Sequence, residues 1–360
     1  MKILIIAYYY PPYRGVGAIR PAYWHQRLML DGFDSYVITA TKQEVKEKKI
    51  IYVEPISRKR ALIKDQGTNW SAPLIQFFKH FDVSFDFVLF TGGPFMHFSV
   101  ASMFRRQYPS TKIILDFRDP FAQNPRFKNS WLKIRVKRFY EKRFIKNADE
   151  IVTVNRYCAS LIDVNPDKCT IIDNGFDERI VYTSKKYKGP LIDDGKINFV
   201  YAGNFAQGYG DPTIFINAIS RFSDRMKFHH LGNESHNFSS IYKTAIKHGM
   251  KSYAEAISIM KVCDVGLIFT SGLPYESTTK VFDYMACNLD ILIISDLGNT
   301  KGALHKITEA YPKVTWIEND LNSLVDYLRA RKNRDIISLP TDIHQFSRDA
   351  GYKKLLKLIE

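Results

Sequence analysis

The sequence has few cysteines, and they are scattered. The four are Cys158, Cys169, Cys263 and Cys287, and no two of them form a C-x-x-C pair. This spacing argues against a disulfide scaffold and against a cysteine-ligated zinc site. We expect reduced, buried thiols in a cytoplasmic protein.

Long apolar runs are also lacking. No run approaches the ~18–20 residues that a membrane-spanning helix needs. The opening MKILIIAYYYPP is too short for a signal peptide, lacks a small-residue cleavage site, and predicts a first strand instead. No histidine cluster or Asp-x-Asp pair suggests a bound metal, so we expect no metal site.

Acidic residues are in the minority, with 37 Asp and Glu against 52 Lys and Arg and a formal net charge of +15. The excess is uneven: 13 of these cations and only 3 of these acids lie within residues 101–147. A basic surface predicts an anionic partner, such as phospholipid headgroups, a phosphorylated substrate or nucleic acid. The alternative is a basic face that only keeps the protein soluble.

What the chain does have is a repeated strand–helix pattern. Its 360 residues, of which 45% are hydrophobic, are enough for two domains of ordinary size. Short apolar runs predict buried strands, and amphipathic segments between them predict helices. The pattern runs from Lys2 to Ile172 and restarts at Ile197, after a polar linker over Thr183–Lys196. The fold class is therefore α/β, with two parallel sheets.

The most informative stretch is Val265–Asp296, which predicts a strand, a loop, a helix beginning near Ser277 or Thr278, and a second strand. Ligands of open α/β sheets bind beyond the carboxyl ends of the strands. The residues expected there are Glu276, Ser277, Thr278, Thr279, Lys280 and Asp283. A cation and amide donors suit a phosphate, and a carboxylate suits sugar hydroxyls. The alternative is a solvated helix start carrying ordinary charges.

Other strand ends carry further candidate residues. Arg14, Gly15 and Gly17 follow the first strand, and Gly203 and Asn204 follow the first strand of the second half. A G-x-G pair alone is weak, and the third glycine of the dinucleotide fingerprint is missing, which argues against an NAD-dependent dehydrogenase. His97, Arg118 and Asp119 follow two more strands, and each of them has an ordinary structural explanation as well, in packing or in a turn.

The segment TTKVFDYMACNLDILIIS resembles the donor-site segment of GT-B glycosyltransferases, particularly glycosyltransferase family 4. In that family two acidic residues, usually both Glu and eight apart, contact the transferred sugar and the nucleotide ribose. The matching residues here are Glu276 and Asp283, which are seven apart. The resemblance therefore implies a nucleoside diphosphate sugar as donor substrate and no cofactor.

Further segments carry the same resemblance along most of the chain, and all are matched in order: PPYRGVG, DFRDPF, NADEIVTVN, IIDNGFD and FSRDAGYKKLLKLIE. It implies a GT-B fold, with two Rossmann-like domains whose parallel sheets face each other across a cleft. By this resemblance we expect residues 1–182 to form an acceptor domain and residues 197–345 a donor domain. Residues 346–360 are expected to form a helix that returns to the first domain.

The resemblance also implies roles for the candidate residues. Glu276, Asp119 and His97 are the catalytic candidates, and Arg14 and Arg118 are expected to bind the acceptor. The donor-binding candidates are Gly15, Gly17, Gly203, Asn204, Ser277, Thr278, Thr279, Lys280 and Asp283. Many family members have Arg or Lys after the glycine that corresponds to Gly203, and this chain has none in its Asn-Phe-Ala-Gln-Gly-Tyr-Gly. Lys280, the backbone amides of residues 203–210 or Arg14 are expected to neutralise the diphosphate instead.

The segment Trp131–Lys146 predicts a basic helix in which aromatic residues alternate with Arg and Lys. Such a helix suits an anionic membrane surface, and no nucleic-acid-binding module is visible. The resemblance implies a glycosyltransferase, and we expect it to act in bacterial surface-glycan synthesis, with a glycan or lipid-linked acceptor and, because of this helix, peripheral membrane contact. The alternatives are a nucleotide-sugar 2-epimerase and a non-catalytic basic protein that binds membrane or nucleic acid.

Overall fold

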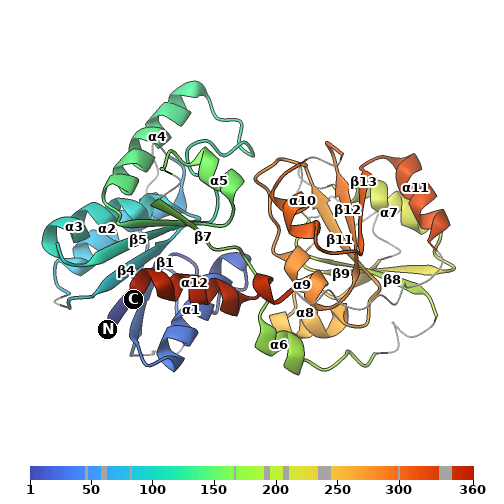
Figure 1. Cartoon of the computed structure of the whole chain (residues 1–360), viewed down its shortest axis with the longest axis horizontal. Coiled ribbons are helices and arrows are strands. Elements are labelled where there is room, and N and C mark those ends of the chain that lie inside the picture. Colours follow the sequence, from blue (N-terminus) through green and yellow to red (C-terminus); the bar gives the residue numbers. More distant parts are fainter. Residues whose placement is uncertain are drawn as a thin grey trace. The chain divides into compact units, whose positions relative to one another are not determined.

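The computed structural model describes residues 1–44, 48–57, 63–81, 83–165, 168–189, 195–205, 211–233, 245–298, 301–331 and 343–360. The chain forms two compact units (Figure 1). Unit 1 comprises Met1–Asp173 and Tyr352–Glu360, and unit 2 comprises Asn174–Gly351. The predicted first domain, 1–182, ends nine residues beyond unit 1, and its boundaries remain a prediction.

Unit 1 contains a fully parallel seven-stranded sheet in the order β3-β2-β1-β4-β5-β6-β7. The strands are β1 (Lys2–Ala7), β2 (Asp34–Thr39), β3 (Ile50–Tyr52), β4 (Phe87–Thr91), β5 (Lys112–Phe117), β6 (Glu150–Thr153) and β7 (Cys169–Ile171). Central strand β1 pairs with β2 from Lys2↔Asp34 to Ala7↔Thr39 and with β4 from Ile3↔Phe87 to Ala7↔Thr91. Its nearly continuous apolar sequence fits a strand that is covered on both faces.

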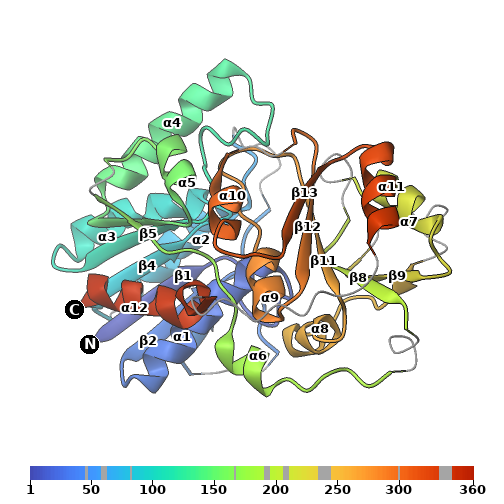
Figure 2. The ribbon, with the colours of Figure 1, turned by 45° about the vertical axis from the view of Figure 1, so that its right-hand side comes forward.

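Helices cover both faces of this sheet, with α1 and α12 opposite α2 and α3 (Figure 2). They are η1 (Val16–Ala18), α1 (Ile19–Leu30), α2 (Gln66–Phe78), η2 (Met96–Val100), α3 (Ala101–Gln107), α4 (Trp131–Lys146), α5 (Arg156–Leu161) and α12 (Arg348–Ile359). Leu4 and Ile6 of β1 face the cluster that contains α2. The alternate residues Ile3 and Ile5 face the cluster that contains α1 and the end of α12. This alternation is the period of two expected for a strand.

Unit 2 repeats the arrangement with a parallel six-stranded sheet in the order β10-β9-β8-β11-β12-β13. The strands are β8 (Ile197–Ala202), β9 (Met226–Leu231), β10 (Ile246–Lys247), β11 (Val265–Thr270), β12 (Asp290–Ser295) and β13 (Val314–Glu318). The helices are α6 (Glu178–Thr183), α7 (Thr213–Ser220), α8 (Tyr253–Met260), α9 (Lys280–Ala286), α10 (Ala303–Thr308), α11 (Leu321–Ala330) and η5 (Ile343–Phe346). Helices α7 and α11 pack on one face, and α8, α9 and α10 pack on the other.

The prediction of two Rossmann-like α/β units is confirmed, and the basic helix predicted over Trp131–Lys146 is found with the same bounds as α4. The sequence analysis missed several short elements, among them α6, β10 and α10, each of six residues or fewer. Elements of this length carry too few residues to show a period. Within the described residues, no helix is long and apolar enough to cross a bilayer.

Each sheet has one point where the strand order reverses, between β1 and β4 in unit 1 and between β8 and β11 in unit 2. Loops that leave such neighbouring strands diverge to opposite faces, which opens a ligand-binding crevice at the carboxyl ends. The sequence analysis selected residues after β1, β4, β8 and β11, and also after β5. The fold therefore places four of the predicted loops at the two points where ligands of this architecture bind.

Two segments of unit 2 run side by side where the chain enters and leaves it. Phe176 pairs with Ser347, and the Phe176 and Arg348 amides donate to the carbonyls of Phe346 and Phe176. A Cβ on Gly175 would lie only 2.4 Å from the Phe346 carbonyl oxygen and 3.0 Å from the Arg348 nitrogen. Both neighbours are backbone atoms, so neither can rotate away. Gly175 is therefore required by the close approach of two chain segments.

We expect Gly175→Ala to destabilise unit 2 by about 1–3 kcal/mol, because the added methyl group forces backbone apart. Urea unfolding followed by circular dichroism measures the change. Gly189→Ala is the matched control, because its Cβ would meet only the side chain of the exposed Tyr187, which is free to move. Equal unfolding midpoints for the two variants would show that the approach at Gly175 is not restrictive.

Candidate functional site

The loop between β11 and α9 holds Glu276 in a fixed position. Its Oε2 accepts hydrogen bonds from the Thr270 hydroxyl at 2.6 Å and from the Ser271 hydroxyl at 3.1 Å. The Glu276 amide donates to the Leu273 carbonyl, which closes a turn. A small cavity beside this carboxyl is lined by Thr270, Gly272, Leu273, Glu276, Gly302, Leu304, His305 and Trp316. The carboxyl end of β11 thus presents an oriented carboxylate next to a cavity.

Helix α9 begins at Lys280, two to three residues later than predicted. Its N-cap Thr279 has helical backbone angles, and its side chain makes no capping hydrogen bond. The expectation that Ser277 or Thr278 caps the helix is therefore wrong. The turn closed by Glu276 occupies the preceding residues, so Ser277 and Thr278 lie in the loop. All three hydroxyl residues are half-buried.

Tyr284 fixes α9 to the sheet. Its ring lies across Gly266 of β11, where a Cβ would come within 2.4 Å of the ring. Its hydroxyl accepts from the Ala202 amide at 3.1 Å and donates to the Val200 carbonyl at 3.3 Å, both on β8. The side chain is completely buried. One tyrosine therefore connects α9 with both strands at the reversal point of the second sheet.

With α9 held in this way, Lys280 reaches the end of β8. Its ammonium nitrogen lies 5.0 Å from the centre of the Tyr201 ring, a cation–π contact. A Cβ on Gly203 would lie 2.6 Å from Lys280 Cε and 3.1 Å from Nζ. Any other residue at position 203 would displace the lysine. The sequence has no cation directly after Gly203, but α9 places the Lys280 ammonium group beside that glycine.

The ends of β8 and β9 are joined beside this lysine. His230 Nε2 donates to the Gly203 carbonyl at 2.7 Å, and the Asn233 amide donates to Asn204 Oδ1 at 2.8 Å. A Cβ on Gly232 would come within 2.2 Å of the Gly203 oxygen, so both strand ends need glycine. Residues 206–210, whose amides were expected to contribute to the phosphate site, lie outside the described residues.

A row of stacked rings continues from Lys280. Phe205 stacks on Tyr201 with ring centres 4.7 Å apart and on His230 with ring centres 4.4 Å apart. The sequence analysis assigned no role to these rings, because residues on three separate segments meet only in the folded chain. Their only sequence signal is that each lies within two residues of a strand-end glycine.

Asp283 contacts α8 and, through it, the segment by which the chain enters unit 2. Its Oδ1 accepts from the Tyr253 hydroxyl at 2.5 Å, and that hydroxyl in turn accepts from the Asp177 amide at 3.2 Å. The Arg348 guanidinium lies over the Tyr253 ring, 4.8 Å from its centre. Burial raises the pKa of Asp283 to about 6, while Arg348 and the Tyr253 hydrogen bond favour the ionised form. The sequence analysis did not predict this network around Asp283, the residue expected to bind the nucleotide ribose.

In unit 1, Arg118 connects two strand-end loops. Its Nε and Nη2 donate to the Gly92 carbonyl after β4 at 2.8 and 2.6 Å, and its Nη1 donates to the Gly17 carbonyl after β1 at 2.9 Å. The structural alternative was a local turn in which Arg118 pairs with Asp119, and the structure instead shows Arg118 as a clamp between two loops at the reversal point. Arg14 is exposed on the loop after β1. A Cβ on Gly15 or Gly17 would meet the rings of Tyr13 or Tyr9, which stack on each other at 4.4 Å.

Beneath that clamp lies a buried ion pair that the sequence analysis did not identify. Arg20 Nη2 donates to Asp116 Oδ1 at 3.1 Å, and the other carboxylate oxygen accepts from the Thr91 hydroxyl at 3.1 Å. Arg20 also donates to the Ile172 carbonyl at 2.8 Å. These contacts join β5, β4, α1 and the end of β7. Asp119, three residues beyond Asp116, is exposed at the same end of β5.

The third catalytic candidate, His97, lies inside unit 1. It is completely buried, and its ring packs against Trp70 at 5.3 Å and Phe98 at 5.1 Å between centres. Burial lowers the pKa of His97 to about 3, so the ring is neutral at physiological pH. This environment corresponds to the packing explanation rather than to a base exposed to substrate.

Together, unit 2 places a cation, the Glu276 carboxylate and aromatic rings at the carboxyl ends of β8, β9 and β11, with a second carboxylate, Asp283, buried in the first turn of α9. The cation suits a phosphate and the carboxylates suit sugar hydroxyls. Within the described residues, no group of three or more His, Cys, Asp and Glu side chains is arranged to hold a metal ion. The geometry thus favours binding of an anionic, hydroxyl-rich ligand.

No protein-family model matches the sequence, and no curated protein matches it either. The structure resembles those of Anabaena HepE in complex with UDP-glucose (TM-score 0.71, 13% identity, 100% of this chain and 99% of that chain) and the lipopolysaccharide glycosyltransferase WaaG (0.65, 14%, 99% and 95%). It also resembles a putative UDP-N-acetylglucosamine 2-epimerase from Listeria monocytogenes (0.64, 12%, 99% and 95%). At these identities the likeness establishes the fold, which is that of the GT-B glycosyltransferases.

Proposed function

We propose that this protein is a glycosyltransferase that moves a sugar from a nucleoside diphosphate sugar to an acceptor hydroxyl. The observation that carries the proposal is the position of Lys280, whose ammonium group lies against Gly203 at the end of β8. Glu276 lies at the end of the neighbouring strand, held by two hydroxyl groups. A diphosphate at Lys280 and a sugar at Glu276 would occupy adjacent strand ends, as in the donor site of family 4, to which we assign the chain.

In the proposed reaction, the bond between the sugar C1 and the diphosphate oxygen breaks. A new bond forms between C1 and the acceptor oxygen, and the proton of the acceptor hydroxyl passes to the departing diphosphate. The departing diphosphate gains negative charge, which the Lys280 ammonium stabilises. Glu276 orients the transferred sugar, and Asp283 accepts from the ribose. We propose retention of the anomeric configuration, with no cofactor and no metal.

We assign the acceptor to unit 1, through Arg14, Arg118 and Asp119. The guanidinium of Arg118 acts there mainly by holding its two loops, because its donors already meet backbone carbonyls. We assign no step to His97, because its ring does not reach the surface. The proposed setting is hexosyl transfer to a glycan or lipid-linked acceptor of a bacterial surface glycan, in the cytoplasm, with peripheral contact to an anionic membrane.

The second candidate is a nucleotide-sugar 2-epimerase, supported by the likeness to the Listeria structure. Such an enzyme uses the same donor site and needs no acceptor. Incubation with the donor alone separates the two activities. An epimerised nucleotide sugar would favour the epimerase, and an unchanged donor that is consumed only with an acceptor would favour the transferase.

Lys280→Ala is expected to weaken binding of the preferred nucleoside diphosphate by about 10- to 100-fold, as lost charged hydrogen bonds do. Calorimetric titration with UDP, GDP, CDP, ADP and dTDP identifies that nucleotide and measures the change. Lys306→Ala removes the same charge from the exposed side of α10 and is the control. Failure of the wild type to bind any of the five would count against the proposal.

Glu276→Gln is expected to leave binding of the nucleoside diphosphate unchanged and to weaken binding of the matching nucleotide sugar. The reason is that this carboxylate is assigned to the sugar rather than to the phosphates. Once an acceptor is known, turnover should fall by about 100-fold or more. Equal loss of affinity for diphosphate and sugar nucleotide would instead assign Glu276 to the diphosphate or to the shape of the loop.

Asp283→Asn is expected to stabilise unit 2 at pH 7.5 by on the order of 1–3 kcal/mol while weakening nucleotide binding. The folded protein holds the Asp283 proton more tightly than the unfolded chain, with a pKa of about 6 against 3.8. The ionised carboxylate therefore lowers the free energy of unfolding above pH 6, and this cost disappears below pH 3.8. Urea unfolding at pH 7.5 and pH 4 measures both values. A difference that does not change with pH would contradict the assignment.

A further inference from the structure

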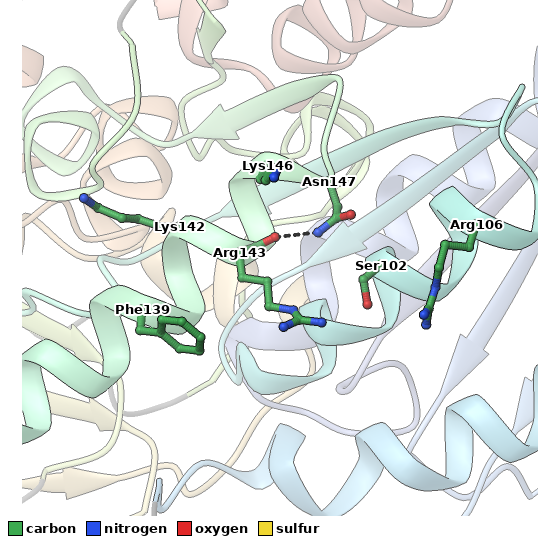
Figure 3. Close-up of a pocket in the computed structure, with 7 residues that line it drawn as sticks. All are labelled: Ser102, Arg106, Phe139, Lys142, Arg143, Lys146 and Asn147. Atoms are coloured by element: carbon green, nitrogen blue, oxygen red, sulfur yellow. Dashed lines mark hydrogen bonds between the residues drawn. The ribbon is translucent and has the colours of Figure 1, made fainter.

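We propose that the pocket between α3 and α4 binds the phosphate of an anionic lipid headgroup at a bilayer surface. The pocket is lined by Ser102, Arg106, Phe139, Lys142, Arg143, Lys146 and Asn147 (Figure 3). This inference rests on the membrane contact proposed above and identifies the part of the protein that makes it. All of its residues belong to unit 1, whereas the residues that carry the proposed donor site belong to unit 2.

Four cations line the pocket, and three of them lack an acidic partner within the part of the chain that the structure describes. Among the described residues, no carboxylate pairs with Arg106, Arg143 or Lys146. Their neighbours differ: Arg138 and Lys142 pair with Asp163 at 3.1 and 3.2 Å, and Arg105 pairs with Asp149. In Figure 3 the Arg106 and Arg143 guanidinium groups lie on either side of the Ser102 hydroxyl. Three cations and a hydroxyl donor around one space suit a phosphate group.

Helix α4 separates its residues into two faces. The inward side, spaced by three and four residues, carries Ile134, Lys137, Glu141 and Phe144, and the last two of these are buried. The outward side carries Trp131, Arg135, Phe139, Arg143 and Lys146, and all five are exposed. The Arg135 guanidinium lies over the Trp131 ring, 5.6 Å from its centre. The pocket is therefore the end of an outward stripe in which aromatic and cationic side chains alternate.

Exposed apolar side chains beside the cations favour a bilayer over a dissolved anion. Phe127, Trp131, Leu132 and Phe139 are between 57% and 68% exposed and lie within thirteen residues of the chain. By contrast, the aromatic face of α2 is packed in the core, with Trp70 and Phe78 buried. A soluble phosphate would not require exposed Trp and Leu. An interfacial helix uses such residues to enter the acyl boundary while its cations meet the headgroups.

The experiment is sedimentation of the full chain with vesicles of phosphatidylcholine alone and of phosphatidylcholine with 30 mol% phosphatidylglycerol, roughly the anionic content that attracts basic helices. We expect binding to the anionic vesicles only. The triple variant Arg106→Ala, Arg143→Ala, Lys146→Ala should lose at least about tenfold in apparent affinity. Lys185→Ala, Lys186→Ala, Lys188→Ala removes the same charge from an exposed segment of unit 2 and should lose about twofold or less.

A second variant tests the apolar part of the stripe. Trp131→Ser with Phe139→Ser keeps every charge, and its binding to anionic vesicles should also fall by about tenfold. Equal losses in the two triple variants would overturn the pocket in favour of a general effect of net charge. Full competition by millimolar glycerol phosphate, with no effect of the aromatic changes, would make the ligand a free phosphate. Tighter binding to a single-stranded oligonucleotide, lost in the same variant, would make it a nucleic acid.

Nucleotide titration of the same triple variant separates this inference from the proposed reaction. Unchanged affinity for the nucleoside diphosphate, combined with lost vesicle binding, supports the headgroup pocket. Loss of both would mean that the substitutions disturb the fold, and vesicle binding by the charge-retaining Arg106→Lys, Arg143→Lys variant then decides. If that variant, folded as judged by circular dichroism, fails to bind anionic vesicles, the pocket is overturned.

Discussion

The proposed donor site depends on how Tyr284 is buried. Its ring occupies the space that Gly266 leaves open on β11, and its hydroxyl satisfies the Ala202 amide and the Val200 carbonyl at the end of β8. A buried hydroxyl without such partners would cost roughly 1–3 kcal/mol, so the helix is held in one position. Because α9 is so short, the contact made by Tyr284 fixes the orientation of the whole helix and of its other side chains. Lys280 is directed to Gly203, and Asp283 is directed to Tyr253.

The two units hold their strand-end loops in place with different side chains. In both, strand-end loops leave the point where the sheet order reverses, and polar groups of such loops need partners. Unit 1 uses Arg118, which bonds the carbonyls of Gly17 and Gly92. Unit 2 uses His230, which bonds the Gly203 carbonyl, and a close packing of Gly203 against Gly232. In unit 1 the cation Arg118 is used to hold the loops in place. In unit 2 the His230 contact does this, and the cation Lys280 remains available for a ligand.

The proposed site also bears a cost to stability that a purely structural region would avoid. Asp283 is buried with a raised pKa, although an amide or an apolar residue would be accepted there more easily. Arg348 and Tyr253 reduce the cost without removing it. Perturbed groups of this kind gather at functional sites, because a site is arranged for its ligand rather than for the free protein. The surface of α4 follows the same logic, with exposed aromatic side chains beside cations.

The sequence by itself determined the two α/β units, the positions of most strands and helices, and the strand ends at which ligands of this architecture bind. Those features follow from the local periodicity of hydrophobic residues and from the positions of glycine, which are properties of residues close together in the sequence. The tertiary structure decided which side chains meet. It brought Lys280 to a strand end 77 residues earlier in the chain, joined Tyr284 to Ala202, buried His97 among aromatic rings, and paired Arg20 with Asp116. Contacts between residues so far apart leave no local signal, because they arise from the packing of whole elements on a common sheet.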